Sequence, residues 1–183
     1  MTYYGPKELA ASFRTVRNNT IQIAEDIPEE HYSYQATPET QTVAGTLVHL
    51  ALNPRLQEQV HLVERRNTLV GFDFFAFRDR QAADAQAPRS KAEIVDLLRT
   101  EGEKFAKALE GLSDEFLAER VEFMPHMVPP DKTRFEMLLG VKEHEMHHRG
   151  QLMLVERLLG ITPHLTRRMQ EMVAAMKAAQ SGG

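Results

Sequence analysis

The chain has 183 residues, of which 42% are hydrophobic and 26% charged, and its formal net charge is -4 at pH 7. This length suffices for one domain with a buried core, and an acidic balance without clustered lysines and arginines gives no support for nucleic-acid binding. There are no cysteines, which excludes disulfides, thiolate metal ligands and a cysteine nucleophile. No leader-like segment is evident, and no apolar run approaches the about 20 residues that a membrane span needs, so we expect a single cytoplasmic domain over 1–183 without membrane contact.

The N-terminal third contains two helical patterns. Apolar residues recur every three or four positions from Pro6, which suits a first turn, to Asp26, and predict a helix between them. A second helix is expected over 41–66. Pro54 lies in its interior and has no N–H, so we expect a kink or a restart of the helix where the carbonyl of Leu50 loses its donor.

Residues 67–89 predict an irregular connection. Within it, four phenylalanines fall within six residues: Phe72, Phe74, Phe75 and Phe77. Four large apolar rings so close together in the sequence should be buried. We expect them to cover one end of the helical bundle. The alternatives are the wall of a substrate pocket and a contact with a second subunit.

Two further helices begin with a capping box, a serine or threonine followed three residues later by glutamate. They start at Ser90 and Thr133, and we expect them to end near Gly111 and at Gly160. The stretch between them, 113–132, predicts a long connection.

A last helix is expected from Thr162 to about Ala179, followed by a frayed tail over 181–183. Three methionines share one face of it and suit packing in a core or against a second subunit: Met169, Met172 and Met176. The whole chain is therefore predicted to be all-α, a four-helix bundle with an additional C-terminal helix.

The most informative pattern is a pair of histidines, His144 and His148, in the helix that begins after Thr133. Four residues are about one helical turn, so both imidazoles project from one face, and that face carries the apolar stripe. Two neutral imidazoles one turn apart can bind a divalent transition metal. Glu145 and Arg149 lie further round the helix, where we expect them to pair with each other on the outer surface.

A third histidine, His49, lies on the inward face of the helix predicted over 41–66. One ligand from this helix and two from another suit a metal site between neighbouring helices of a bundle, and three ligands leave a coordination position open. The other histidines are weaker candidates; His61 falls off the inward face, and His164 directly follows Pro163.

Three segments, Asp26–Tyr32, Thr42–Leu50 and His144–Leu152, occur in an order and approximate spacing that resembles the DinB-like superfamily, which is related to YfiT-like metal-dependent hydrolases. The resemblance implies a four-helix bundle with a divalent metal held by His49 and by the two histidines of the last segment. Members include thiol S-transferases that use low-molecular-weight thiols and a mycothiol-dependent maleylpyruvate isomerase. The chain departs from its relatives in having no tryptophan, so the resemblance identifies no substrate. Together with the apolar C-terminal stripe, it favours a homodimer.

An all-imidazole site leaves the metal its full charge, so the ion can lower the pKa of a bound water or thiol. Zn or Ni is expected. Since the chain has no cysteine, a thiol must come from a small molecule, and we expect a metal-dependent transferase that activates a low-molecular-weight thiol for attack on a small electrophile. One alternative is a hydrolase that uses metal-bound water. The other is a non-catalytic bundle in which the metal is structural or a ligand is bound without turnover.

Three residues are candidates for a catalytic role beside the metal. Glu101 lies in the apolar stripe of the helix that begins at Ser90, where a carboxylate either serves the metal region or reaches water near a bundle end. Gln151 shares the face of His148. Asn53 lies one turn after His49, beside the break expected at Pro54.

Overall fold

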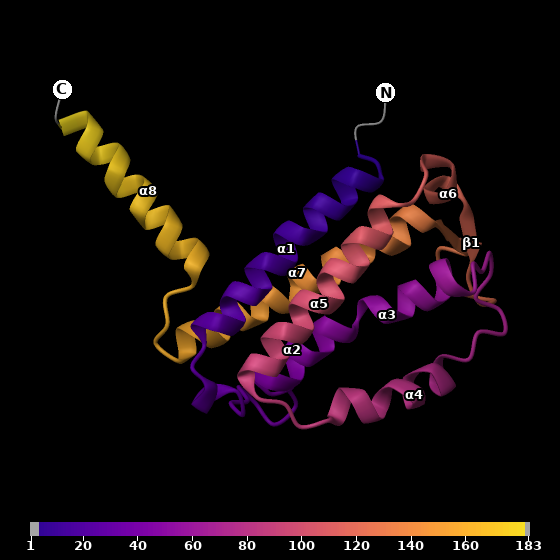
Figure 1. Ribbon diagram of the computed structural model, residues 1–183, viewed down its shortest axis with the longest axis horizontal. Helices are drawn as coiled ribbons and strands as arrows, with labels where there is room; N and C mark the ends of the chain where they lie inside the picture. Colours follow the sequence, from indigo (N-terminus) through magenta and orange to yellow (C-terminus); the bar gives the residue numbers. More distant parts are fainter. Residues whose placement is uncertain (1–3, 182–183) are drawn as a thin grey trace.

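The computed structural model describes residues 4–181, and its centre is a four-helix bundle (Figure 1). The bundle helices are α1 (Pro6–Asp26), α2 (Val43–Leu52), α5 (Lys91–Glu110) and α7 (Arg134–Leu158). Helices α1 and α2 each pack against both α5 and α7. The predicted fold class is confirmed, and the capping boxes at Ser90 and Thr133 begin α5 and α7 as expected. Among the described residues, no helix is long and apolar enough to cross a membrane.

The helix expected over 41–66 is divided into three segments. After α2 come α3 (Pro54–Gln57) and a π-helical segment, η2 (Glu58–Val63). The break predicted at Pro54 is thus confirmed. The carbonyl of Leu50, which loses its helical donor there, accepts a hydrogen bond of 2.8 Å from Nη2 of Arg17.

Arg17 of α1 connects the other three bundle helices. Its Nε lies 2.9 and 3.1 Å from the two carboxylate oxygens of Glu145 on α7, and its Nη1 donates to the carbonyl of Leu98 on α5 at 2.9 Å. The side chains of Arg17 and Glu145 are only 3% and 1% exposed. The predicted surface pair of Glu145 with Arg149 is therefore wrong, because α1 covers the face of α7 that carries Glu145.

The absence of a side chain at Gly102 on α5 makes room for Arg17. A Cβ at this position would lie 2.7 Å from Cγ of Arg17, which is held by buried hydrogen bonds and cannot easily move. We expect Gly102→Ala to lower the free energy of unfolding by about 1–3 kcal/mol in urea titrations. Gly140→Ala is the matched control on α7, where nothing lies within 4 Å of an added Cβ. This variant should have a free energy of unfolding up to about 1 kcal/mol higher than that of the parent, because alanine has the higher helix propensity. Equal changes in the two variants would contradict this account of Gly102.

Residues 67–89, expected to be irregular, contain a helix, α4 (Phe74–Gln86), which lies beside α2. The side chain of Asp73 caps it by accepting a hydrogen bond from the N–H of Ala76 at 2.8 Å. None of its residues is fully buried, so no continuous apolar stripe marks it in the sequence. The four phenylalanines do not cover one surface as a group, since Phe72, Phe74 and Phe77 pack in one cluster while Phe75 is 71% exposed.

The connection over 113–132 contains a short helix, α6 (Asp114–Ala118), and an antiparallel pair of strands, β1 (Arg120–Glu122) and β2 (Asp131–Thr133). Beside it lies His61, which is completely buried. Its Nε2 is 2.9 Å from Oε1 of Gln57 and its Nδ1 is 3.0 Å from Nη1 of Arg134. Burial, with a smaller contribution from Arg134, lowers the pKa of His61 to about 4. The expectation that His61 lies off the inward face is wrong because η2 has π-helical winding, which changes the register of that face.

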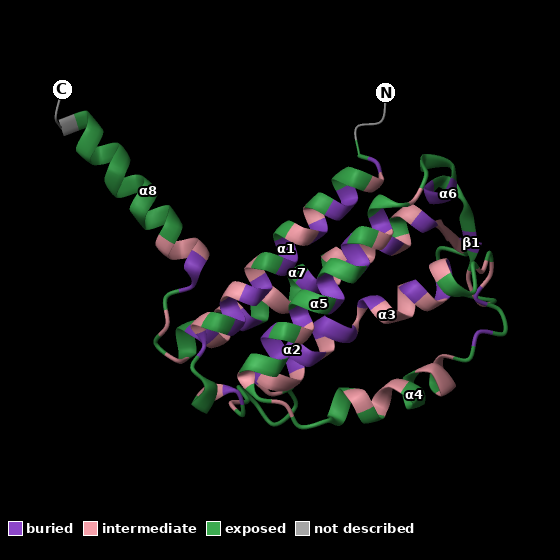
Figure 2. Cartoon of the chain, in the orientation of Figure 1, coloured by how far each residue is buried: buried purple, intermediate pink, exposed green. Residues whose placement is uncertain are grey.

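The C-terminal helix α8 (His164–Ser181) projects away from the bundle (Figure 1), and most of its surface is exposed (Figure 2). Each of its three aligned methionines is more than half exposed. Their packing in the core of this chain is therefore excluded, and their packing against a second subunit stays a prediction. Ser181 is helical rather than frayed, and residues 182–183 lie outside the described residues. His164, which falls in the first turn of the helix expected from Thr162, begins α8 and is buried, with Nε2 at 3.1 Å from Oδ1 of Asn19.

Glu156 is fully buried near the C-terminal end of α7, and neither of its carboxylate oxygens has a hydrogen-bond partner. Burial, with a smaller contribution from the negative charge of Asp26, raises the pKa of Glu156 from 4.5 to about 7. The folded state binds the proton on the Glu156 carboxyl more tightly than the unfolded state does. The stability that this protonation contributes to the fold is therefore fully present below about pH 4.5 and is lost as the pH rises through about 7. We expect Glu156→Gln to exceed the parent in free energy of unfolding by about 2–3 kcal/mol at pH 8 and to match it near pH 4.5. A difference that does not change with pH in urea titrations would contradict this.

Candidate metal centre

Three histidines meet between α2 and α7. His49 comes from α2 and His144 and His148 from α7, and one ring nitrogen of each lies within 4.8 Å of the others. The Nε2 atoms of His49 and His144 are 2.7 Å apart. Ring centroids are separated by 5.0 Å for His49 with either partner and by 4.6 Å for His144 with His148. The structure thus brings together the three residues selected from the sequence, and their cluster could hold a metal ion.

The chemistry of the cluster fits a divalent transition metal. Burial lowers the pKa of His49 to about 4, with smaller contributions from His144 and His148, and burial also lowers the pKa of His144. These two rings are therefore neutral at physiological pH and have lone pairs available for a cation. The 2.7 Å between the Nε2 atoms of His49 and His144, and the 4.8 Å within which all three ligand atoms lie, put the imidazole nitrogens close enough to share one ion.

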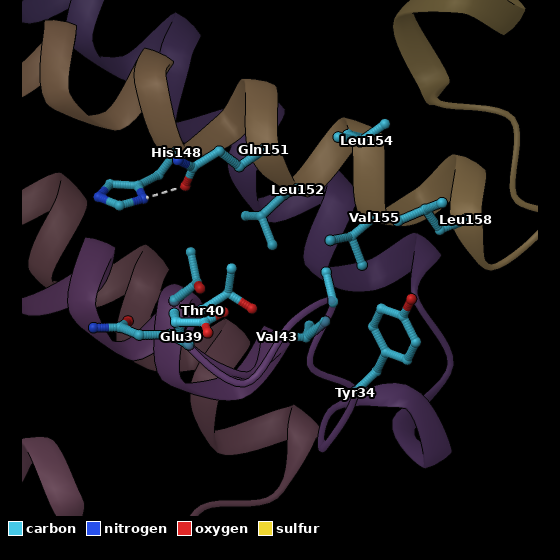
Figure 3. Close-up of a pocket in the computed structure, with 13 residues that line it drawn as sticks. Tyr34, Glu39, Thr40, Val43, His148, Gln151, Leu152, Leu154, Val155 and Leu158 are labelled. Atoms are coloured by element: carbon cyan, nitrogen blue, oxygen red, sulfur yellow. Dashed lines mark hydrogen bonds between the residues drawn. The ribbon is translucent and has the colours of Figure 1, made fainter.

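Gln151 orients one of the three rings. Its Oε1 lies 2.8 Å from Nδ1 of His148, shown as the dashed line in Figure 3, and its Nε2 lies 3.2 Å from Nε2 of His147. An amide oxygen only accepts, so Nδ1 of His148 carries the proton and Nε2 keeps its lone pair. This is the arrangement that fixes the tautomer of a histidine ligand.

We expect Gln151→Leu to weaken metal affinity by about 10–100-fold, because Nδ1 of His148 loses its acceptor. The measurement is competition with a chromogenic chelator on the folded protein. Gln151→Glu keeps an acceptor oxygen and should retain most of the affinity. If both variants lose affinity equally, Gln151 acts through packing rather than through this hydrogen bond.

The other two sequence candidates are placed differently. Glu101 is nearly buried, and its Oε1 accepts hydrogen bonds from Arg55 on α3, including one of 3.1 Å from Nε. Arg55 in turn contacts Gln81 and Asp84 of α4. The partner of Glu101 is therefore a guanidinium group, not a histidine or bulk water. Asn53 lies beside His49 in the lining of a cavity. A catalytic role for Glu101, Asn53 or Gln151 stays a prediction.

The cluster is reached from two sides. A cavity of about 390 Å³ touches His148 and Gln151, and Figure 3 shows its α7 side chains opposite the segment that carries Glu39 and Thr40. A second cavity, of about 550 Å³, touches His49 and lies between α2, α3 and α4. Gln41 contributes to both linings. Two cavities therefore adjoin the cluster, one at His148 and the other at His49.

The sequence analysis predicts neither the role of Arg17 nor the contribution of Glu39 and Thr40 to the first cavity. Arg17 lies on the apolar stripe of α1, as Glu101 does on that of α5, and a charged residue at such a position indicates a buried partner. No comparable signal marks Glu39 and Thr40, which reach the first cavity only because the loop before α2 folds back toward α7.

Comparison with known proteins decides the family. The family model described as the DinB family matches residues 1–179. The chain belongs to the DinB family. The predicted resemblance is thus confirmed over almost the whole chain.

Among curated proteins, this DinB-family chain is similar to the uncharacterized protein YjoA of Bacillus subtilis strain 168, with 28% identity over 159 residues, covering 85% of this chain and 91% of YjoA. The crystal structure of a DinB-like protein from Bacillus cereus ATCC 10987 matches with a TM-score of 0.65 and 20% identity, covering 88% of this chain and 97% of that one. YfiT of Bacillus subtilis, described as a probable metal-dependent hydrolase with an unusual four-helix bundle topology, matches with a TM-score of 0.65 and 16% identity over 88% of this chain and 91% of YfiT. At these identities the two structures establish the shared fold.

Proposed function

We propose that this DinB-family protein is a metal-dependent transferase that activates a low-molecular-weight thiol for attack on a small electrophile. His49, His144 and His148 would hold the metal, with Zn or Ni expected. The observation that carries the proposal is the pair of cavities that adjoin one three-histidine cluster. A reaction between two small molecules needs a space for each on either side of the activating group.

When bound, the metal supplies positive charge that lowers the pKa of a thiol or water. The protein supplies the rest. Gln151 keeps the lone pair of His148 directed at the cluster, and apolar side chains in the two linings, such as Val155 and Leu52, offer surface to an apolar substrate. Because the chain has no cysteine, the nucleophilic sulfur comes from a small molecule.

Hydrolysis is the second candidate, and the structural likeness to YfiT favours it. The same cluster with water in place of thiol would attack an ester or amide. The two reactions differ only in the nucleophile, so one set of assays separates them.

The test uses zinc- and nickel-loaded protein with cysteine or glutathione and 1-chloro-2,4-dinitrobenzene. The sulfur displaces chloride, and the thioether is followed by its absorbance. In parallel, 4-nitrophenyl acetate reports hydrolysis without thiol. We expect thioether formation that disappears in His148→Ala and persists in His147→Ala. Ester hydrolysis alone would favour the hydrolase, and no turnover by metal-loaded protein with either substrate set would overturn the enzymatic proposal in favour of a structural metal.

A further inference from the structure

The cavity beside α4 has an unusual charge composition. It occupies about 550 Å³, within the range of small-molecule sites. Arg78 is the one arginine or lysine in its lining, and no aspartate or glutamate lines it. The walls are mostly apolar and include Phe74 and Phe77 of α4 and Leu56 of α3, with His49 at the cluster side. Arg78 itself is exposed, so this space combines apolar walls with a single positive side chain that water can also reach.

The charge of Arg78 is not neutralised by the protein. Its guanidinium carbon lies 5.4 Å from the centroid of the Phe75 ring, and no carboxylate among residues 4–181 forms an ion pair with it. Two other arginines near α4 are paired with carboxylates. Arg55 binds Glu101 and Asp84, and Arg89 also binds Asp84. Arg78 thus retains a free fork of donors, which suits bidentate binding of a carboxylate.

The first cavity has the opposite charge. Glu39 is the one aspartate, glutamate, lysine or arginine in its lining, accompanied by the hydroxyl groups of Tyr34 and Thr40 and the amide of Gln41. An organic anion is therefore repelled on the His148 side of the cluster and attracted on the His49 side. The two cavities differ in the ligands that they can accept.

We propose that the cavity beside α4 binds a small organic carboxylate with a flat apolar body. The carboxylate pairs with Arg78, and the apolar body packs among Phe74, Phe77 and Leu56, with its far end toward His49. This names the substrate class of the electrophile, and in that respect it rests on the proposed function. Binding itself requires neither metal nor turnover, so it can be tested separately.

The probe is 2-naphthoate, titrated calorimetrically into metal-free and zinc-loaded protein, with 2-naphthamide as its neutral counterpart. Losing a hydrogen bond to a charged group weakens binding by at least about tenfold, so we expect this loss of naphthoate affinity in Arg78→Gln. Arg80→Gln removes the same charge from the same helix at a residue outside the lining, where its guanidinium carbon lies 6.0 Å from the centroid of the Phe77 ring. It controls for the loss of a cation beside the apolar wall, and its naphthoate affinity should stay within about twofold of that of the parent. Naphthamide affinity should be the same in all three proteins.

The possible results separate this inference from the proposed function. Arg78-dependent binding to the metal-free protein supports the carboxylate site even if no turnover is ever observed. Absence of naphthoate binding would overturn the site. So would equal binding by the parent and Arg78→Gln, or naphthoate binding that appears only with zinc and does not depend on Arg78. A parallel loss of naphthamide affinity in Arg78→Gln would assign Arg78 to packing and would also overturn the site.

Discussion

Replacing Arg17 with methionine should lower the free energy of unfolding by about 3–5 kcal/mol, the cost typical of breaking a buried ion pair by removing one partner. The substitution leaves the carboxylate of Glu145 buried at 1% exposure and deprives the carbonyls of Leu50 and Leu98 of their donor. The measurement is urea unfolding followed by circular dichroism. Because Leu50 directly follows His49 and Glu145 directly follows His144, the variant should also bind metal more weakly while still folded.

Two controls define this result. Arg14→Met removes an arginine one turn earlier on α1, whose partners Glu103 and Glu110 are both more than 40% exposed. Arg14→Met should therefore lower the free energy of unfolding by no more than about 1 kcal/mol. The double variant Arg17→Met/Glu145→Leu also removes the unpaired carboxylate, so it should recover part of the free energy of unfolding that Arg17→Met loses. Equal small losses for Arg14→Met and Arg17→Met would show that the buried network does not hold the helices together.

Zinc at about 1,000 times its dissociation constant should raise the free energy of unfolding of the parent by about 4 kcal/mol, because the ion binds the folded state and not the separated helices. His144→Ala should abolish this increase. The measurement is thermal or urea unfolding at pH 7.5 with and without zinc at fixed protein concentration.

The matched control is His147→Ala, which removes a neighbouring imidazole that does not belong to the cluster. This variant should retain most of the increase, apart from any loss through its contact with Gln151. If His144→Ala is stabilised by zinc as strongly as the parent, the ion binds elsewhere on the protein.

The sequence was sufficient for the bundle and the cluster because both depend on helical periodicity. His144 and His148 share a face by spacing alone, and the break at Pro54 follows from its missing N–H. The capping boxes marked the starts of α5 and α7 in the same local way. Interactions within a few residues were therefore predictable.

Features that depend on distant partners or on unusual helical winding were not predictable in this way. The partner of Glu145 is Arg17, 128 positions away in the sequence, so local spacing favoured Arg149 instead. His61 turns inward in a π-helical segment that standard periodicity does not describe. Helix α4 buries none of its residues completely, so it left no apolar stripe, although it forms one wall of the cavity that contains Arg78.

The most direct test of the metal centre is elemental analysis of the purified, untagged protein beside His49→Ala, His144→Ala and His148→Ala. We predict about one equivalent of a divalent transition metal per chain in the parent and its loss in each variant, with the helical circular dichroism spectrum retained. Absence of bound metal in the parent after incubation with Zn and with Ni would contradict the account, and so would equal metal content in the parent and the three variants.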